Sequence, residues 1–252
     1  MSFDAKEIGE ILVNDNSESQ VIGDGSRSGE VNWNRTALVE KRLMNSEFYE
    51  EPDDESRSGY FGKRPIIGRD VPVIGGVYLG ASSREAIVVS ENSKLMTEFY
   101  QTIKDQLDEA RDAGINIKSM VMKMVYDYVL EVMPYSQNEV DKIAKDYKLG
   151  RDEKISLEVY LNRKAGVCRH QALMVAYILE SLKRDGYVRG DISVDRNSVK
   201  GLGGHAWVRY TNSRGVVYII DPAQKYLGRL ENVQGERWFY ERPEDVVREQ
   251  AA

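Results

Sequence analysis

Apolar residues recur at every third or fourth position through the middle of the chain, which is the period of an amphipathic helix. Between residues 92 and 113 the repeating positions are Leu95, Phe99, Ile103 and Leu107, and Gly114 ends the pattern. The same pattern predicts three more helices, over residues 117–133, 137–148 and 156–163.

Short β-branched runs separated by turn residues predict strands in two other regions. Residues 65–90 contain two such runs, joined by Gly and Pro turns. HAWVRY (205–210) and GVVYIID (215–221) flank the turn residues NSRG and predict an antiparallel hairpin. A turn centred on Ser213 places His205 opposite Asp221 and Trp207 opposite Ile219, with each pair on one face of the sheet. A register slip of one residue would send one member of each pair to the other face.

The first 60 residues differ from the rest of the chain in composition and charge. They are rich in Asn, Ser, Gly and Glu, and they hold 14 acidic and 6 basic residues. This composition predicts a flexible, loosely tethered arm. The alternative is that residues 31–49, which include Trp33 and Leu38, form a short helix that docks on the following domain. An acidic arm in front of a nearly neutral domain would also be suited to covering a cleft.

Composition and charge exclude several classes of protein. The chain has 252 residues, 41% of them hydrophobic, which is enough for one good-sized core. No apolar run approaches the roughly 18 residues of a membrane span, and the opening MSFDAKEIGE is too acidic and polar for a secretory signal. The pI of 5.2 and the lack of a basic stripe argue against nucleic acid. We therefore expect a cytoplasmic protein that binds neither membrane nor nucleic acid.

The only cysteine of the chain, Cys168, lies in the first turn of a further predicted helix, 167–184, which is apolar on nearly all sides and therefore buried. The free amides and the positive dipole end at a helix start favour the thiolate, which is the nucleophilic form. The same amides could hold an oxyanion. The alternative is that Cys168 is a small buried hydrophobe, since a single cysteine cannot form an intrachain disulfide.

A nucleophilic thiol needs a base, and the chain has only two histidines. His170 lies two residues after Cys168, about 200° around the helix axis, so it faces away from the thiol and is expected to be structural. His205 begins a strand opposite Asp221, whose carboxylate would fix the imidazole tautomer and stabilise its charged form. Each residue alone has a structural explanation. Together, Cys168, His205 and Asp221 predict a catalytic triad.

The segments that carry these three residues, GVCRHQA, GGHAWVRY and IIDPA, resemble signature segments of the transglutaminase-like branch of papain-like cysteine enzymes. The resemblance covers roughly residues 115 to 230. It implies Cys168 as nucleophile, His205 as general acid and base, and Asp221 as the residue that orients His205. It also implies an α+β fold in which the nucleophile helix packs on an antiparallel sheet. We therefore divide the chain into an N-terminal arm (1–60), accessory strands and a helix (61–114) and a catalytic domain (115–252).

Other family features have weaker counterparts. Some relatives assist the oxyanion with a Gln or Trp, for which Asn162 and Gln171 are the candidates here. Gly204 and Trp207 are candidate substrate contacts, although core packing is the simpler explanation for Trp207. Nothing resembles the calcium sites of the large animal transglutaminases, and the run EEPDDE lacks the alternating ligands of a calcium loop. We expect no metal and no cofactor.

The predicted function is cysteine-dependent acyl transfer on peptide or carboxamide bonds of a protein or peptide substrate, through an acyl-enzyme. Hydrolysis by a protease or amidase is favoured over amine transfer, because the GLGG run before His205 leaves the rim of the site low and open to water. The alternative is a non-catalytic peptide-binding or scaffolding domain on the same fold. The sequence predicts neither the substrate nor the oligomeric state.

Overall fold

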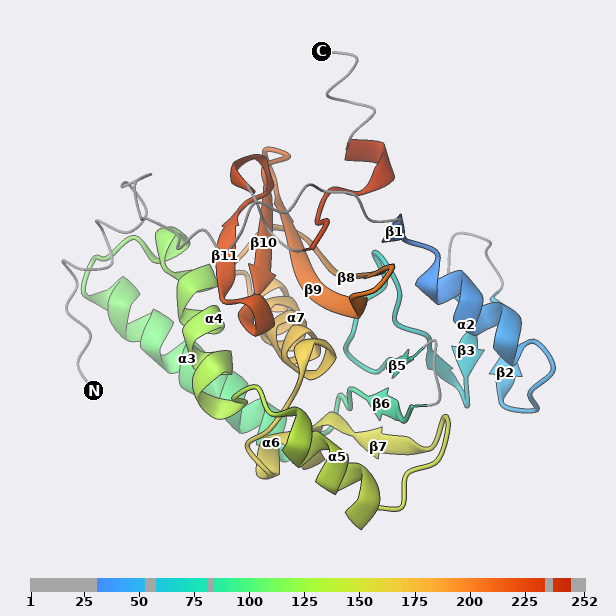
Figure 1. Ribbon diagram of the computed structural model, residues 1–252. Coiled ribbons are helices and arrows are strands. Elements are labelled where there is room, and N and C mark those ends of the chain that lie inside the picture. The colour runs from blue at the N-terminus through green and yellow to red at the C-terminus, as the bar shows by residue number, and fades with distance from the viewer. Residues whose placement is uncertain (1–30, 53–57, 81–83, 234–237, 246–252) are drawn as a thin grey trace.

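The computed structural model describes residues 31–52, 58–80, 84–233 and 238–245. In this part of the chain, helices and three sheets form an α+β fold, which confirms the expected fold class (Figure 1). The strands pair antiparallel, except for β6 (Ala86–Val88), which pairs in parallel with β7 (Lys154–Ser156). None of the described helices has the length and apolar character needed to cross a membrane.

The largest sheet has five antiparallel strands in the order β1-β8-β9-β10-β11. These strands are β1 (Val31–Asn32), β8 (Gly190–Val199), β9 (Gly203–Asn212), β10 (Val217–Asp221) and β11 (Tyr226–Arg229). β8 and β9 pair over their full length, from Gly190 opposite Asn212 to Val199 opposite Gly203. His205 lies within this long strand pair, opposite Asn197.

Helix α7 (Cys168–Arg184) packs on one face of this sheet and is buried on nearly all sides, as its apolar sequence predicts. Helices α3 (Lys94–Asp112) and α4 (Val121–Val132), which precede it in the chain, lie on its other side (Figure 1). The remaining helices are α2 (Arg35–Leu43), α5 (Gln137–Asp146) and α6 (Leu157–Asn162). The hydroxyls of Ser93, Ser136 and Ser156 accept amide hydrogens at the starts of α3, α5 and α6, which fixes where these helices begin.

Two three-stranded sheets lie beside this core. One consists of β2 (Tyr49–Glu50), β3 (Tyr60–Phe61) and β4 (Arg64–Pro65), and the other of β5 (Val77–Leu79), β6 and β7. β5 and β6 are the two strands predicted within residues 65–90. The second sheet matters for the site, because Glu85, just before β6, bonds to the side chain of Arg169 in the first turn of α7.

The described part of the N-terminal arm is folded onto the domain, so the prediction of a flexible arm is wrong for residues 31–52. Val31 of β1 pairs with Val199 of β8, and α2 follows as the docking helix that the alternative predicted. The ring of Trp33 packs edge-on against Trp207 of β9, with centroids 5.6 Å apart. Residues 1–30 and 53–57 lie outside the described residues.

The β9–β10 hairpin forms, but its register is two residues away from the prediction. Ile219 lies opposite Arg209 rather than opposite Trp207, and His205 lies opposite Asn197 of β8. The cause is the turn, where Asn212 Oδ1 accepts the amides of Arg214 and Val216 and moves the centre by one position. Because side chains alternate with a period of two, the shift keeps His205 and Asp221 on the same face.

Candidate active site

Cys168 begins α7 at a close crossing of two chain segments. The amide of Gly166 donates to the carbonyl of Pro134, and the carbonyl of Gly166 accepts from Ser136. A side chain at Gly166 does not fit, because its Cβ would lie 2.6 Å from the sulfur of Met133. The glycine before the cysteine therefore allows the segment after α4 to lie beside the start of α7. Cys168 itself stays partly exposed at this edge.

Two backbone amides at the start of α7 have no backbone acceptor among the described residues. The amides of His170 and Gln171 both donate to the carbonyl of Val167, at 2.9 and 3.1 Å. Within the described chain, the amides of Cys168 and Arg169 have no backbone acceptor. They lie at the positive end of a 17-residue helix dipole, next to the thiol.

His205 on β9 connects the thiol to the carboxylate of Asp221 at the end of β10. His205 Nε2 lies 2.5 Å from Asp221 Oδ2, and both side chains are almost fully buried. The thiol of Cys168 hydrogen-bonds the imidazole of His205 and the backbone amide of Ala206. Since Nε2 faces the carboxylate, Nδ1 is the nitrogen left for the sulfur. The structure thus brings the three predicted residues together in the order thiol, imidazole, carboxylate.

The ionisation of the thiol and the imidazole follows from this contact. Burial alone would lower the pKa of His205, but its hydrogen bonds to Asp221 and Cys168 and their negative charges raise it to about 9. Burial raises the pKa of the Cys168 thiol, but the hydrogen bond and charge of His205, with a smaller contribution from Arg169, bring it below its ordinary value. Both shifts favour the same pair of charged forms, a thiolate beside an imidazolium.

His170 faces away from the thiol, as the helix geometry predicts, and caps the helix start. Its Nδ1 accepts the amide of Val167 at 3.1 Å, and its ring lies against that of Tyr160 with centroids 3.9 Å apart. Its Nε2 lies 3.6 Å from Glu85 Oε1. Burial and the charge of Arg169 lower the pKa of His170 to about 3, so it is neutral at physiological pH.

Glu85 and Arg169 form a buried ion pair next to the thiol. Arg169 Nη2 donates to Glu85 Oε1 at 2.6 Å. Burial raises the pKa of Glu85, but its contacts with His170 and Arg169 outweigh this and hold it far below the ordinary value. The pair ties β6 to the first turn of α7 and leaves a guanidinium close to Cys168.

The structure separates the weaker candidate residues. Gln171 is wrong as an oxyanion donor, because it is fully buried and its Nε2 donates to the carbonyl of Met133 at 2.8 Å. Asn162 lies exposed at the C-terminal end of α6. Trp207 is wrong as a substrate contact, because its side chain is 0% exposed. It packs beside His205 with ring centroids 5.8 Å apart, in the core role that was the simpler explanation. Gly204 is exposed beside His205.

Two aromatic residues of the segment 238–245 contact the site and were not predicted from the sequence. Trp238 stacks on the His205 imidazole, with centroids 4.5 Å apart and an interplanar angle of 20°. Tyr240 donates its hydroxyl to Asp221 Oδ2 at 2.8 Å. The only sequence signal is the cluster of aromatics in WFY at 238–240, which does not indicate the strand that it covers.

Comparison with known proteins gives no likeness to draw on: no family model, curated protein or solved structure matches the chain.

Proposed function

We propose that this protein is a cysteine-dependent acyl-transfer enzyme with a transglutaminase-like, papain-like core, which hydrolyses peptide or carboxamide bonds through an acyl-enzyme. The observation that carries the proposal is the pairing of the Cys168 thiol with an imidazole that a buried carboxylate holds in its charged form. The arrangement of α7 against β9 and β10 supports the core, since it joins a helix-start thiol to the end of an antiparallel hairpin.

Acylation uses the thiolate and the proton on His205. The sulfur of Cys168 attacks the carbonyl carbon, and the carbonyl electron pair moves onto its oxygen. The intermediate collapses as the carbon–nitrogen bond breaks, and the leaving amine takes the proton from the His205 imidazolium. The products of this step are a free amine, a thioester on Cys168 and a neutral imidazole.

The oxyanion of that intermediate needs donors that are already in place. The amides of Cys168 and Arg169 are the available donors, because neither has a backbone acceptor within the described residues. The positive end of the α7 dipole adds to them. This assignment replaces Gln171, whose amide is used inside the core.

Deacylation restores the starting state. A water molecule gives a proton to His205 as its oxygen attacks the thioester carbon, and the collapse of this second intermediate releases the acid and the Cys168 thiolate. An amine in place of water would give transfer, but water is present at about 55 M and an amine needs a pocket that excludes it. Trp207 cannot wall such a pocket because it is buried, and Gly204 is exposed, so hydrolysis is favoured.

An open backbone edge beside the thiol favours a peptide as substrate. β10 ends at Asp221, so residues 203–206 of β9 extend past it with no β10 partner. The amide of Ala206 points from this edge toward Cys168. In a strand, residues two apart point their backbone groups the same way, so the amide and carbonyl of Gly204 are presented on this side as well. An extended peptide could pair with them as an added strand.

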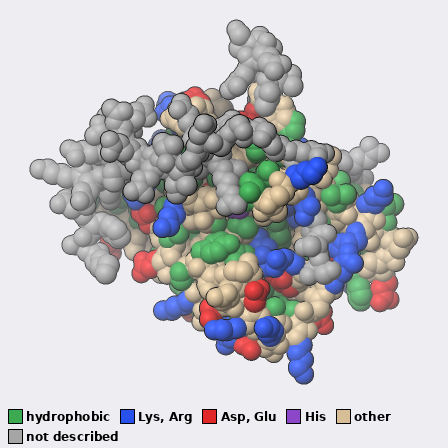
Figure 2. Space-filling model, viewed as in Figure 1, with side chains coloured by type: hydrophobic (Ala, Val, Ile, Leu, Met, Phe, Trp, Pro, Cys, Tyr) green, Lys and Arg blue, Asp and Glu red, His purple; other side chains and the backbone are tan. Residues whose placement is uncertain are grey.

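The charged side chains on the visible face of the molecule suggest which peptides to test first. Figure 2 shows Lys and Arg side chains gathered over α2 and the small sheets beside it, with hydrophobic side chains in the middle of the same face. Acidic side chains are interspersed on the same face, so a donor series should include acidic, neutral and basic peptides. A reducing compartment such as the cytoplasm would keep the thiol free.

The proposal is tested by mass spectrometry of the intact protein after incubation with peptide, glutamine and ester donors. The expected result is an acyl adduct on Cys168 that appears with the free amine and decays to free acid, and that is absent in Cys168→Ala. Excess labelled primary amine in the same reaction separates the two outcomes of deacylation. Free acid without amine incorporation supports hydrolysis, and dominant amine adducts would show transfer. A thiol that forms no adduct with any donor would favour the alternative of a non-catalytic peptide-binding or scaffolding domain.

A further inference from the structure

The segment 238–245 crosses the face of the large sheet opposite to α7. That face is formed by alternate residues of β8 and β9: Ser193, Asp195, Asn197, His205, Trp207 and Arg209. Asn197, which lies opposite His205, donates its side-chain amide to the carbonyl of Phe239 at 2.8 Å. The segment thus lies directly over the strand positions that flank His205.

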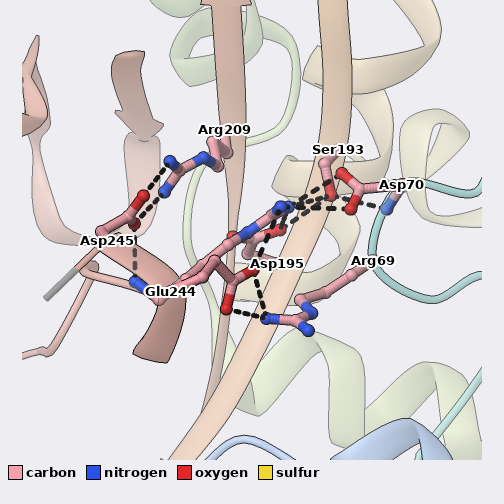
Figure 3. A network of polar contacts seen from close by, with 8 residues as sticks. Arg69, Asp70, Ser193, Asp195, Arg209, Glu244 and Asp245 are labelled. Atoms are coloured by element: carbon pink, nitrogen blue, oxygen red, sulfur yellow. Dashed lines mark hydrogen bonds and ion pairs between the residues drawn. The ribbon is translucent and has the colours of Figure 1, made fainter. Parts of the chain in front are cut away.

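One arginine, Arg242, anchors this segment to two other parts of the chain, and Figure 3 shows its partners Asp70, Ser193 and Asp195. Arg242 donates to both carboxylate oxygens of the fully buried Asp195, at 2.6 and 2.7 Å, and to the hydroxyl of Ser193 at 2.9 Å. It also bonds both oxygens of Asp70, at 3.0 and 3.1 Å. A buried arginine with this many charged partners holds its segment in one position, because moving it would leave Asp195 unpaired.

A second ion pair fixes the far end of the segment. Arg209 of β9 makes a two-pronged contact with Asp245, with both distances 2.8 Å. Asp245 also accepts the backbone amide of Arg242. The two ion pairs therefore join the segment to β8 and β9, the strands that carry Asn197 and His205.

The contacts of these two aromatics end on the predicted triad itself. Tyr240 Oη and His205 Nε2 approach the same oxygen of Asp221, Oδ2, while Oδ1 accepts the amide of Gln224 at 3.2 Å. With donors on both oxygens, the carboxylate cannot turn about its Cβ–Cγ bond without losing one of them. Trp238 covers the other flank of the imidazole by stacking on it.

We infer that segment 238–245 is a clasp that positions the triad, and that Tyr240 is a positioning residue which holds the Asp221 carboxylate against His205. The inference rests on the proposed function, in which His205 must keep its proton while the thiolate attacks. The hydroxyl of Tyr240 bonds Asp221, so Tyr240 acts on His205 through that carboxylate. A purely structural Tyr240 would contribute to stability alone.

The test is the pH dependence of the alkylation of Cys168 by iodoacetamide, between about pH 5 and about pH 10.5. The signal comes from one site, because the chain has a single cysteine. In the wild type we expect an upper inflection near pH 9, where His205 loses its proton. In Tyr240→Phe, which keeps the ring and removes the hydroxyl, this inflection should fall by roughly one pH unit, because a carboxylate that can rotate stabilises the imidazolium less.

Tyr226→Phe is the matched control, because the Tyr226 ring stacks on Tyr240 while its hydroxyl bonds the carbonyl of Arg229. Its inflection should stay at the wild-type value. Asp245→Asn, which weakens the anchor, should shift the inflection the same way as Tyr240→Phe but less. Thermal unfolding of each variant sets the temperature at which all are folded.

An inflection in Tyr240→Phe that stays in place or moves upward would overturn the positioning role. Alkylation needs no substrate, so this result is independent of turnover. A protein that shows the shift but acylates with no donor would contradict the proposed function and leave the clasp standing. A protein that turns over substrate, but whose Tyr240→Phe variant shows no shift, would support the proposed function and contradict the clasp.

Discussion

The two histidines of this protein have similar surroundings, yet at neutral pH His170 is neutral and His205 carries a positive charge. Each is buried, and each has a carboxylate beside its Nε2: Glu85 for His170 and Asp221 for His205. Yet burial and the neighbouring Arg169 lower the pKa of His170 to about 3, whereas the hydrogen bonds of His205 outweigh burial and raise its pKa to about 9. A carboxylate neighbour is therefore not enough to charge an imidazole.

The difference lies in what else touches the ring and the carboxylate. The charge of Glu85 is already matched by the guanidinium of Arg169, which also repels a proton on His170. The other nitrogen of His170 accepts a backbone amide, so protonating it would break that bond. At His205 the other donors to the carboxylate, the hydroxyl of Tyr240 and the backbone amide of Gln224, are neutral, and the other ring nitrogen faces a thiol. Because these donors carry no charge, the negative charge of Asp221 remains to stabilise the protonated imidazole.

The largest expected effect comes from removing one histidine or the other. His205→Ala and Cys168→Ala should each lower turnover by at least about 10⁴-fold, because the two residues act as one unit. His170→Asn, whose amide oxygen can still accept the Val167 amide, should keep most of the activity. Steady-state kinetics on a donor identified by mass spectrometry measure all three. Equal losses at His170 and His205 would reverse the assignment of the base.

Replacing the carboxylate of one histidine with an amide should have the next largest effect. Asp221→Asn should lower turnover by about 10³-fold, since it keeps the shape but loses the charge and can select the wrong tautomer. The upper inflection of Cys168 alkylation should also fall toward that of an ordinary histidine. An unchanged inflection would mean that Asp221 does not supply the charge that raises the pKa of His205.

The two histidines should also give the free energy of unfolding opposite dependences on pH. The pKa of His170 is lowered on folding, so its contribution is present above about pH 6.5 and is lost as the pH falls toward 3. The pKa of His205 is raised, so its contribution is present below about pH 6.5 and is lost as the pH rises through 9. Urea unfolding of the wild type, His170→Asn and His205→Asn across this range checks both. Parallel slopes in the two difference curves would contradict the comparison.

The smallest and most selective change is to make the surroundings of His170 more like those of His205. Arg169→Gln removes the cation that competes for Glu85, so the pKa of His170 should rise by roughly two units. It should remain below that of His205, because the ring still accepts the Val167 amide. NMR titration of the imidazole signals measures this directly in a chain with two histidines. A His170 that titrates as in the wild type would show that burial alone keeps it neutral.

The parts of this site that the sequence predicts are those whose pattern is local. The long apolar run after Gly166 identifies α7, and the turn residues between two β-branched runs identify the hairpin of β9 and β10. The register was wrong because the side chain of Asn212 organises the turn, which counting residues does not reveal. The shared face of His205 and Asp221 survived because an error of two residues preserves the alternation.

Neither strand β8 nor the segment 238–245 that packs on it could be predicted from the sequence, for a physical reason. β8 buries Ser193, Asp195 and Asn197, so it lacks the apolar alternation of a strand with one face in the core. These polar groups are tolerated because partners from a distant part of the chain bond them: Arg242 bonds Ser193 and Asp195, and the carbonyl of Phe239 accepts the side-chain amide of Asn197. Polar residues of this kind indicate burial only once their partner is known, and nothing in the local pattern names Arg242.

The measurement that tests the central claim most directly is the rate of Cys168 alkylation at mildly acid pH, compared with that of a small free thiol. If His205 and Asp221 hold the sulfur as a thiolate, the protein should react faster than the free thiol near pH 6 and show a second inflection near pH 9, where His205 loses its proton. His205→Ala should remove both features. A wild-type profile with one inflection at or above the ordinary thiol value of about 8.5 would contradict the account, since it would mean that Cys168 has no activating partner.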